Sequence, residues 1–450
     1  MTKYLLRNTA LDILIRVGEG GGFSHLLINQ AIEKKGLSDR DEALLTEIVY
    51  GTIQRKLTID YYLSHFIKGN KKLDSWVKWL LYMSIYQMTY LDKVPDHAII
   101  HESVEIAKKR GHKGISSMVN GVLRSLQRKG LPLFEKVTDP VQRLGIETSH
   151  PFWLVKRWVD MYGFDVTEEM CKTNLHHKPI SVRVQPMKIS REDAIERLQD
   201  QGFEVEISNF SNQGLIITQG NVLRSNLFYD GYVTIQDQSS MLVAEMLQLQ
   251  EEMTVLDACS APGGKATHIA EKMSNKGVVF AYDLHEKKAK LVGKKALELD
   301  LSIINAKQAD SRDLASYHEE SSFDRILLDA PCSGLGVLRG KPDIKYSKSE
   351  QDIEKLASIQ IELLESVSSL LKKDGKLLYS TCTVDKHEND NVIEKFLASH
   401  QDFEVDSSFF DGLPEIIKKN SIGISKWGVQ LFPQEFDTDG FFLTRLKKKR

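Results

Sequence analysis

The sequence has few cysteines and no long apolar run, and these two shortages exclude several classes of protein. Its 4 cysteines form no Cys-x-x-Cys pair, so neither a zinc module nor a disulfide framework is indicated, and a reducing, cytoplasmic setting is favoured. No apolar run reaches the ~18–20 residues that a membrane span needs. Because Arg7, Asn8, Asp12 and Arg16 interrupt the first apolar stretch, we also expect no signal peptide. The sequence therefore predicts a soluble protein without a membrane partner.

Charge is nearly balanced overall but is unevenly distributed along the chain. The formal net charge is −2, which by itself argues weakly against a nucleic-acid partner. Between Val104 and Gly130, however, Glu105 is the only acidic residue in a strongly basic stretch, and the chain ends in RLKKKR. The basic residues of that stretch are Lys108, Lys109, Arg110, Lys113, Arg124, Arg128 and Lys129. Two interpretations stay open, a solvated helix face or a surface that binds nucleic acid.

Three segments of the chain differ in the periodicity of their apolar residues. Residues 1–145 repeat apolar positions at helical spacing, as in ALDILIRV, which predicts an all-α bundle. Residues 146–235 follow the order strand, helix, strand, strand, which predicts a small α+β unit. In residues 236–450 strands alternate with helices and the last strand is GFFLTRL, which predicts an α/β domain with a parallel, doubly wound, Rossmann-like sheet.

The stretch VLDACSAPGGKATHIAEKM predicts a strand, a tight turn and a helix. The Pro-Gly-Gly turn at 262–264 lets the backbone approach a ligand closely, but its spacing is not that of a phosphate-binding loop. The strand in VLDAC ends at an aspartate, and the next three predicted strands end at or near Asp283, Asp310 and Asp329. These acids are expected at the edge where such sheets bind ligands. Asp283 could accept both hydroxyls of a ribose. S-adenosylmethionine fits a site with little phosphate-binding character better than NAD does.

Two cysteines, Cys332 and Cys382, stand at the ends of predicted buried strands. A thiolate beside the cofactor can add to carbon 6 of cytosine, which makes carbon 5 nucleophilic toward an activated methyl group. Asp329 could stabilise the adduct at ring nitrogen 3 or the exocyclic amine, and Lys265 could supply positive charge. Cys171 lies outside every motif and is interpreted as a small buried residue. No residues have metal-ligand spacing, so we expect no metal site.

The motifs DACSAPGGKATH, DAPCSGLGVLRGKPDIKY and STCTVDKHEND resemble those of the RNA cytosine-C5 methyltransferases. In that family the nucleophile is the cysteine of the later Thr-Cys motif, which corresponds to Cys382, and the earlier one, Cys332, is associated with product release. The family's cofactor contacts correspond to the glycine turn and to the strand-end acids. These residues are Cys259, Ser260, Ala261, Pro262, Gly263, Gly264, Lys265, Asp283, Asp310 and Asp329.

The stretch VPDHAIIHESVEIAKKRGHKGISSMVNGVLR is similar to the NusB-like helical domain that is fused to one bacterial branch, the RsmB (Sun or Fmu) enzymes. This resemblance implies a monomer with a NusB-like RNA-binding domain at 1–145, an RRM-like RNA-binding or linker unit at 146–235 and a methyltransferase domain at 236–450. It implies methylation of 16S rRNA at carbon 5 of a single-stranded or loop cytosine, position 967 in conventional rRNA numbering.

Further expectations concern the loop of the second motif and the function. The loop GVLRGKPDIKY could hold the flanking phosphates through Arg339, Lys341 and Lys345, and the alternative that it is only a solvated basic loop stays open. Two alternatives for the function stay open, a cytosine-C5 methyltransferase that acts on tRNA, and an RNA-binding scaffold whose methyltransferase domain is inactive. The chain retains Cys382 and Asp283, which an inactive scaffold would be free to lose.

Overall fold

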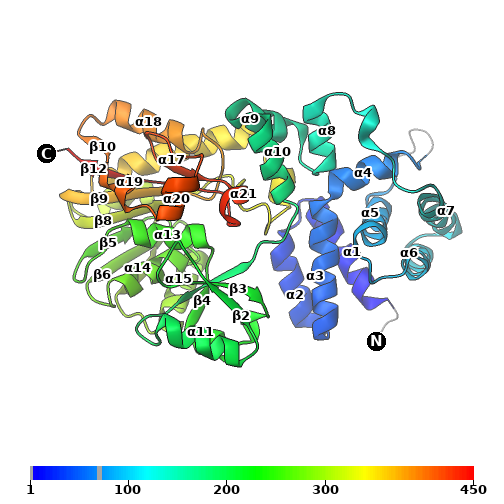
Figure 1. Ribbon diagram of the computed structural model, residues 1–450, viewed down its shortest axis with the longest axis horizontal. Coiled ribbons are helices and arrows are strands. Elements are labelled where there is room, and N and C mark those ends of the chain that lie inside the picture. Colours follow the sequence, from blue (N-terminus) through cyan, green and yellow to red (C-terminus); the bar gives the residue numbers. More distant parts are fainter. Residues whose placement is uncertain (1–3, 68–72, 450) are drawn as a thin grey trace. The chain divides into compact units, whose positions relative to one another are not determined.

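The computed structural model describes residues 4–67 and 73–449 and divides the chain into two compact units (Figure 1). Unit 1 contains the residues up to His176 together with Leu338–Ser347, and unit 2 contains His177–Val337 together with the residues from Lys348 onward. The predicted boundaries at 145 and 235 fall inside these units, so the division into three domains stays a prediction. No helix among the described residues is both long and apolar enough to cross a membrane.

Unit 1 is built from helices, as its apolar periodicity predicts, and within its described part no strand is present. In the stretch ALDILIRV, Ala10, Ile13 and Leu14 are buried on one helix face. The fifth helix is buried nearly all round, from Trp79 to Gln87. The helices are α1 (Leu5–Gly18), α2 (Ser24–Lys35), α3 (Asp39–Gln54), α4 (Lys56–Ser64), α5 (Ser75–Tyr90), α6 (Asp96–Arg110), α7 (Lys113–Lys129), η1 (Phe134–Lys136), α8 (Pro140–Glu147), α9 (Phe152–Tyr162), α10 (Phe164–Thr173) and α16 (Ile344–Ser347).

The segment Leu338–Ser347 follows a catalytic-domain motif in the sequence but packs within unit 1. Lys345 is fully buried there, and its Nζ donates to the carbonyl oxygen (2.9 Å) and to Oε1 (2.8 Å) of Gln54. The prediction that Lys345 contacts RNA phosphates is therefore wrong, because its ammonium has no access to solvent. Arg339 is nearly buried and donates to the carbonyl oxygen of His176 at 3.0 Å, whereas Lys341 is exposed, so their contacts with RNA stay predictions.

The basic stretch of unit 1 lies on α6 and α7 and is exposed. Two of its side chains form ion pairs within the unit: Lys108 pairs with Glu105 (2.6 Å) and Arg110 with Asp12 (2.7 Å). Both pairs are solvent-exposed and therefore weak, so they leave the stretch able to bind a polyanion. Its role in RNA binding stays a prediction.

Unit 2 contains two sheets, and the smaller has the predicted order strand, helix, strand, strand. Its elements are β1 (Ile180–Val184), α11 (Arg191–Asp200), β2 (Glu204–Ile207) and β3 (Gly214–Gln219). A short strand that the sequence analysis missed, β4 (Val233–Ile235), follows η2 (Val222–Arg224) and α12 (Asn226–Tyr229). The order β2-β3-β1-β4 is antiparallel throughout, so β4 is an edge strand next to β1.

The larger sheet has eight strands in the order β10-β12-β9-β8-β5-β6-β7, with β11 paired to β12. Strands β5 to β9 are parallel, but β12 is antiparallel to β9. The predicted strand GFFLTRL is therefore confirmed, whereas the expectation of an all-parallel sheet is wrong at this edge. The strands are β5 (Thr254–Asp257), β6 (Val278–Asp283), β7 (Ile304–Gln308), β8 (Phe323–Asp329), β9 (Leu371–Thr381), β10 (Phe403–Val405), β11 (Val429–Leu431) and β12 (Phe441–Lys448).

Helices cover both faces of this sheet, which confirms the Rossmann-like fold (Figure 1). Successive strand residues contact opposite layers: Val255 packs in a cluster with residues of the α13 and α14 layer, and Leu256 in one with residues of α17 and α18. Strands buried on both faces explain the continuous apolar runs of the sequence. The helices and turns are α13 (Gln238–Met246), α14 (Gly264–Lys272), α15 (Glu286–Glu298), η3 (Ser311–Ser316), α17 (Glu350–Ser368), α18 (Asp390–Ser399), α19 (Ser408–Gly412), α20 (Glu415–Asn420) and α21 (Pro433–Phe436).

Candidate active site

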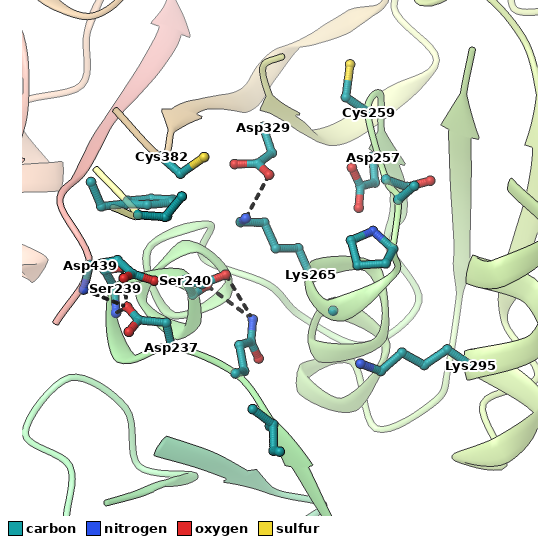
Figure 2. A pocket seen from close by; sticks show the side chains of 18 residues that line it. Asp237, Ser239, Ser240, Asp257, Cys259, Lys265, Lys295, Asp329, Cys382 and Asp439 are labelled. Carbon is teal, nitrogen blue, oxygen red and sulfur yellow. Dashed lines mark hydrogen bonds and ion pairs between the residues drawn. The ribbon is translucent and has the colours of Figure 1, made fainter. Parts of the chain in front are cut away.

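A pocket of about 250 Å³ lies at the carboxyl ends of β5, β8 and β9 (Figure 2). Its walls come from the segment that joins β4 to α13, from the glycine turn before α14, and from β12. The residues that line it are Ile235, Gln236, Asp237, Ser239, Ser240, Asp257, Cys259, Ser260, Ala261, Pro262, Gly264, Lys265, Lys295, Asp329, Val337, Cys382, Asp439 and Phe441. Open α/β sheets bind their ligands at this edge, so the pocket is the candidate active site.

Lys265 and Asp329 form an ion pair inside the pocket, and Figure 2 shows Cys382 beside them. The Nζ of Lys265 lies 2.7 Å from Oδ2 of Asp329, and the hydroxyl of Ser380 donates to Oδ1 at 2.8 Å. Burial by itself would lower the pKa of Lys265, but the charge of Asp329 and the hydrogen bond to it outweigh burial and raise the pKa. Lys265 therefore stays an ammonium at neutral pH.

The two strand-end cysteines meet, although 50 residues separate them in the sequence. Their Sγ atoms are 3.3 Å apart, and only Cys382 lines the pocket. The hydrogen bond to Cys382, and then burial, raise the pKa of Cys332 well above the usual value of a thiol. Cys332 is therefore a protonated thiol at neutral pH, in hydrogen-bond contact with the sulfur that faces the pocket.

Glu388, which the sequence analysis quoted within a motif but did not assign, holds the two cysteine loops together. It is fully buried, and its Oε2 accepts hydrogen bonds from the backbone N–H of Ser333 (2.8 Å) and the amide of Gln360 (3.0 Å). Burial raises the pKa of Glu388. A second link joins the loops, because the N–H of Gly336 donates to the carbonyl oxygen of Cys382 at 3.0 Å.

The glycine turn is positioned by a buried arginine from the small sheet. Arg183 of β1 forms two hydrogen bonds with the carboxylate of Glu271 (2.7 and 2.8 Å), and it donates to the carbonyl oxygen of Gly264 at 2.9 Å. Gly263 has a φ of +101°, and a Cβ there would come within 3.1 Å of the Cα of Val292. Only glycine satisfies both requirements, which explains the glycine at position 263.

Asp257 is the first of the strand-end acids, and the sequence analysis assigned it no role. It is fully buried and lines the pocket, and across the described residues no side chain hydrogen-bonds its carboxylate, although a backbone hydrogen bond from Cys259 acts to lower its pKa. Burial, and then the charge of Asp329, raise the pKa of Asp257 to about 8. A buried carboxyl group that no side chain hydrogen-bonds suits a cationic ligand, because a nearby positive charge would stabilise its ionised form.

A second ion-pair network closes the opposite wall. The Nζ of Lys178 lies 2.7 Å from Oδ2 of Asp237 and also contacts the carboxylate of Asp439. Burial would raise the pKa of Asp237, but Lys178 and the hydroxyls of Ser239 and Thr438 outweigh it and lower the pKa. Asp237 caps α13, a pattern visible in the sequence as Asp-Gln-Ser, whereas its pairing with Lys178 has no local signal.

The structure places most, but not all, of the predicted residues on the pocket. Gly263 forms the turn and does not line the pocket, and neither do Cys332, Asp283 and Asp310. Asp283 ends β6 and accepts a hydrogen bond from the N–H of His285 at 2.9 Å. Asp310 lies past the end of β7 and pairs with Arg312 at 2.6 Å, which together with a backbone hydrogen bond lowers its pKa. Cys171 is buried in unit 1, as expected.

Models of three protein families match successive parts of the chain. The model described as 16S rRNA methyltransferase RsmB/F matches residues 244–447. The NusB family model matches residues 5–128, and a ferredoxin-like domain of RsmF/B-like methyltransferases matches residues 150–223. These matches follow the order of the helical part, the small sheet and the large sheet.

A similar solved structure, the crystal structure of PH0851, covers 98% of both chains with a TM-score of 0.80 and 26% identity. A methyltransferase homologue from Pyrococcus horikoshii covers 69% of this chain and 100% of its own, with a TM-score of 0.59 and 26% identity. These likenesses confirm the fold of each part of the chain.

Relatives by sequence extend over the full length. One relative is a protein of Bacillus subtilis (strain 168) that is called a probable ribosomal RNA small subunit methyltransferase B. It is 47% identical to this chain over 449 residues, and the match covers 100% of both chains. A ribosomal RNA small subunit methyltransferase B of Proteus mirabilis (strain HI4320) is 33% identical, again over 100% of both chains. With full-length identity at this level and a matching order of parts, the chain belongs to the RsmB branch of the RsmB/F methyltransferase family.

Proposed function

We propose that the protein transfers a methyl group from S-adenosylmethionine to carbon 5 of a cytosine in 16S rRNA, at position 967 in conventional numbering. The observation that carries the proposal is the geometry of Cys382. Its sulfur faces a pocket that also presents the Lys265–Asp329 pair, and it lies 3.3 Å from a second, protonated cysteine. The names of its full-length relatives support rRNA as the substrate.

The residues present fit S-adenosylmethionine. Asp257 offers a buried carboxyl group that no side chain hydrogen-bonds, which suits the positively charged methionine end of this cofactor. The loop from Cys259 to Lys265 lies beside it, and Asp283 would take the ribose hydroxyls at the end of β6. When bound, the cofactor supplies a methyl group on a positively charged sulfur atom, which a nucleophilic carbon can attack.

Cys382 is the nucleophile of the proposed reaction. Its thiolate forms a bond to carbon 6 of the cytosine, which places negative charge on the ring and makes carbon 5 reactive. Asp329 would contact ring nitrogen 3 or the exocyclic amine in this adduct, and Lys265 holds Asp329 in place at 2.7 Å. The positive charge of Lys265 also offsets the negative charge that would otherwise build up in the buried site.

Cys332 acts in product release. After methyl transfer a base must take the proton of carbon 5, and the bond between carbon 6 and Cys382 then breaks with its electron pair returning to sulfur. The thiol of Cys332, at 3.3 Å, is placed to give a proton to this departing sulfur. Its raised pKa keeps that proton available at neutral pH.

The experiment that tests the function is bisulfite sequencing of rRNA from a strain that lacks the protein. One small-subunit cytosine should lose protection from deamination in the deletion strain and regain it when the parent gene is returned. Cys382→Ala should fail to restore it. If that cytosine stays protected in the deletion strain, the proposal is wrong, and a loss of protection in tRNA instead would identify tRNA as the substrate.

A further inference from the structure

A second hollow of about 480 Å³ adjoins the active-site pocket on the side of the small sheet. One wall is formed by α12 and the edge strand β4, and the other by the last turn of α15. Ile235 and Lys295 line both hollows, so the two are neighbours that share part of a wall. Its volume lies in the ~300–1,000 Å³ range that holds small ligands or parts of larger ones.

The hollow presents exposed apolar and aromatic groups. Tyr229, at the end of α12, is 72% exposed and Ile235 is 40% exposed. The ring of Phe228 packs against Tyr229 with centroids 6.2 Å apart, and the hydroxyl of Ser225 accepts a hydrogen bond from the N–H of Phe228 at 3.2 Å. The tyrosine ring thus has an open surface, as do the platforms on which proteins stack unpaired bases.

Lys295 supplies positive charge where the two hollows meet. Among the described residues its ammonium has no hydrogen-bond or ion-pair partner, unlike Lys265, the other lysine of the active-site pocket. The adjacent Lys294 instead pairs with Glu298. Burial, and then the charge of Arg183, lower the pKa of Lys295, so the phosphate of a bound strand would stabilise its ammonium form.

The walls are tied together without any ligand. Lys188, which follows β1, forms an ion pair with Asp300 beyond α15 at 2.7 Å. Gly231 sits so close to α15 that a Cβ would come 3.1 Å from the carbonyl oxygen of Glu298. The hollow is therefore preformed, which lowers the entropic cost of ordering it on binding.

We propose that this hollow binds the RNA nucleotide next to the target cytosine, with its base stacked on Tyr229 and its phosphate at Lys295. β4 runs along the hollow and continues into the pocket wall at Gln236 and Asp237, so one segment of protein follows both positions. The inference rests on the proposed function, and it deepens it by assigning a subsite that receives a single-stranded neighbour of the methylated base.

The test measures binding of a small-subunit rRNA hairpin that contains the methylated cytosine. Two further hairpins lack the base on one side or the other of that cytosine. Tyr229→Ala should weaken binding of the complete hairpin about 5- to 150-fold, the loss expected for one stacked base. It should have little effect on one of the two abasic hairpins, because there is no base left to stack. Tyr229→Phe, which keeps the ring, should bind like the parent.

Lys295→Ala should flatten the plot of log K against log salt by about 0.7, the value for one contact with a single strand. Lys294→Ala is the matched control, since Lys294 is its neighbour on α15 and should leave the slope unchanged. All variants should bind S-adenosylmethionine like the parent in calorimetry. Weakened cofactor binding by Lys295→Ala would show that this lysine belongs to the cofactor site and would overturn the proposal.

Two other results also overturn it. In the first, Tyr229→Ala binds the complete hairpin as tightly as the parent does. In the second, its affinity falls by the same factor for all three hairpins. If Tyr229→Ala behaves in either of these ways while the parent protein methylates the rRNA, the subsite alone is refuted. A parent protein that transfers no methyl group to rRNA would refute the proposed function and the subsite with it.

Discussion

Replacing each of the paired cysteines should separate attack on the base from release of the product. Cys382→Ala has no nucleophile, so it should form neither adduct nor methylated RNA. Cys332→Ala keeps the nucleophile and the cofactor site but lacks the thiol 3.3 Å from Cys382. It should therefore attack the cytosine and transfer the methyl group, and then accumulate a covalent complex of protein and RNA.

The size of the effect follows from what Cys332 contributes. A positioned proton donor accelerates its step by about 10²–10⁴-fold, which corresponds to about 2.7–5.4 kcal/mol of activation free energy. Release from Cys332→Ala should slow by that factor. Adduct formation should slow by only about tenfold, because the attacking sulfur loses one hydrogen bond, worth about 1.5 kcal/mol when its partner is charged. Release then becomes much slower than attack, and the adduct accumulates.

A denaturing gel with labelled RNA and S-adenosylmethionine provides the assay, since a covalent complex survives as a slow band. Cys332→Ser, which is close to cysteine in size, should also give the band, and this variant controls for lost volume. The double variant should give none, because attack precedes release. If Cys382→Ala trapped RNA and Cys332→Ala did not, the two roles would be reversed and the reasoning from pocket exposure would be refuted.

Four further predictions concern the cofactor, the stability of the free protein and the RNA. Asp283→Ala should lower cofactor affinity by about one to two orders of magnitude, the equivalent of a charge-assisted hydrogen bond of about 1.5–3 kcal/mol, and unchanged affinity in calorimetry would remove the ribose assignment. At pH 7 Asp257, with a pKa of about 8, is mostly protonated, so binding of a cationic cofactor should release a proton. Calorimetry in buffers of different ionisation enthalpy measures that release, which Asp257→Asn should abolish. Because the folded-state pKa of Asp257 is raised, its contribution to the stability of the free protein should fall as the pH rises from about 4 to about 8, and urea titration across that range checks the sign. Replacing the exposed basic residues of α6 and α7 should flatten the salt dependence of RNA binding by about 0.7–0.9 for each lost contact while leaving cofactor affinity intact, and a variant with the parent's slope would identify a merely solvated face. The replaced residues are Lys108, Lys109, Arg110 and Lys113.

Several elements were predictable because their signals are local. The apolar positions of α1 recur at helical spacing, and the strand-end acids follow apolar runs, so both could be located from neighbouring residues alone. The Pro-Gly-Gly turn was predictable for the same reason, since Gly263 adopts a backbone angle that other residues rarely take. The motif resemblance then placed Cys332 and Cys382 in one site, and the structure brings their sulfurs to 3.3 Å.

Other features depend on residues far apart in the chain and had no local signal. Lys345 looks like a residue of a basic RNA-binding loop, but it is buried against Gln54, 291 positions away. Lys178 reaches Asp439 across 261 positions, and the direction of β12 depends on which strand it pairs with. Glu388 could be read as one more surface charge until its contacts with Ser333 and Gln360 were known.

The sequence by itself determined the kinds of element, the fold class, the family and the two cysteines, because each is encoded in short stretches of chain. The tertiary structure alone decided which of those residues share a pocket: Asp329, Lys265 and Cys382 line it, whereas Asp283, Asp310 and Cys332 do not. It also decided that no side chain hydrogen-bonds the buried carboxylate of Asp257, and that among the described residues Lys295 has no hydrogen-bond or ion-pair partner. Burial and pairing depend on what surrounds a side chain in space, and in this protein that surrounding comes from segments hundreds of residues apart.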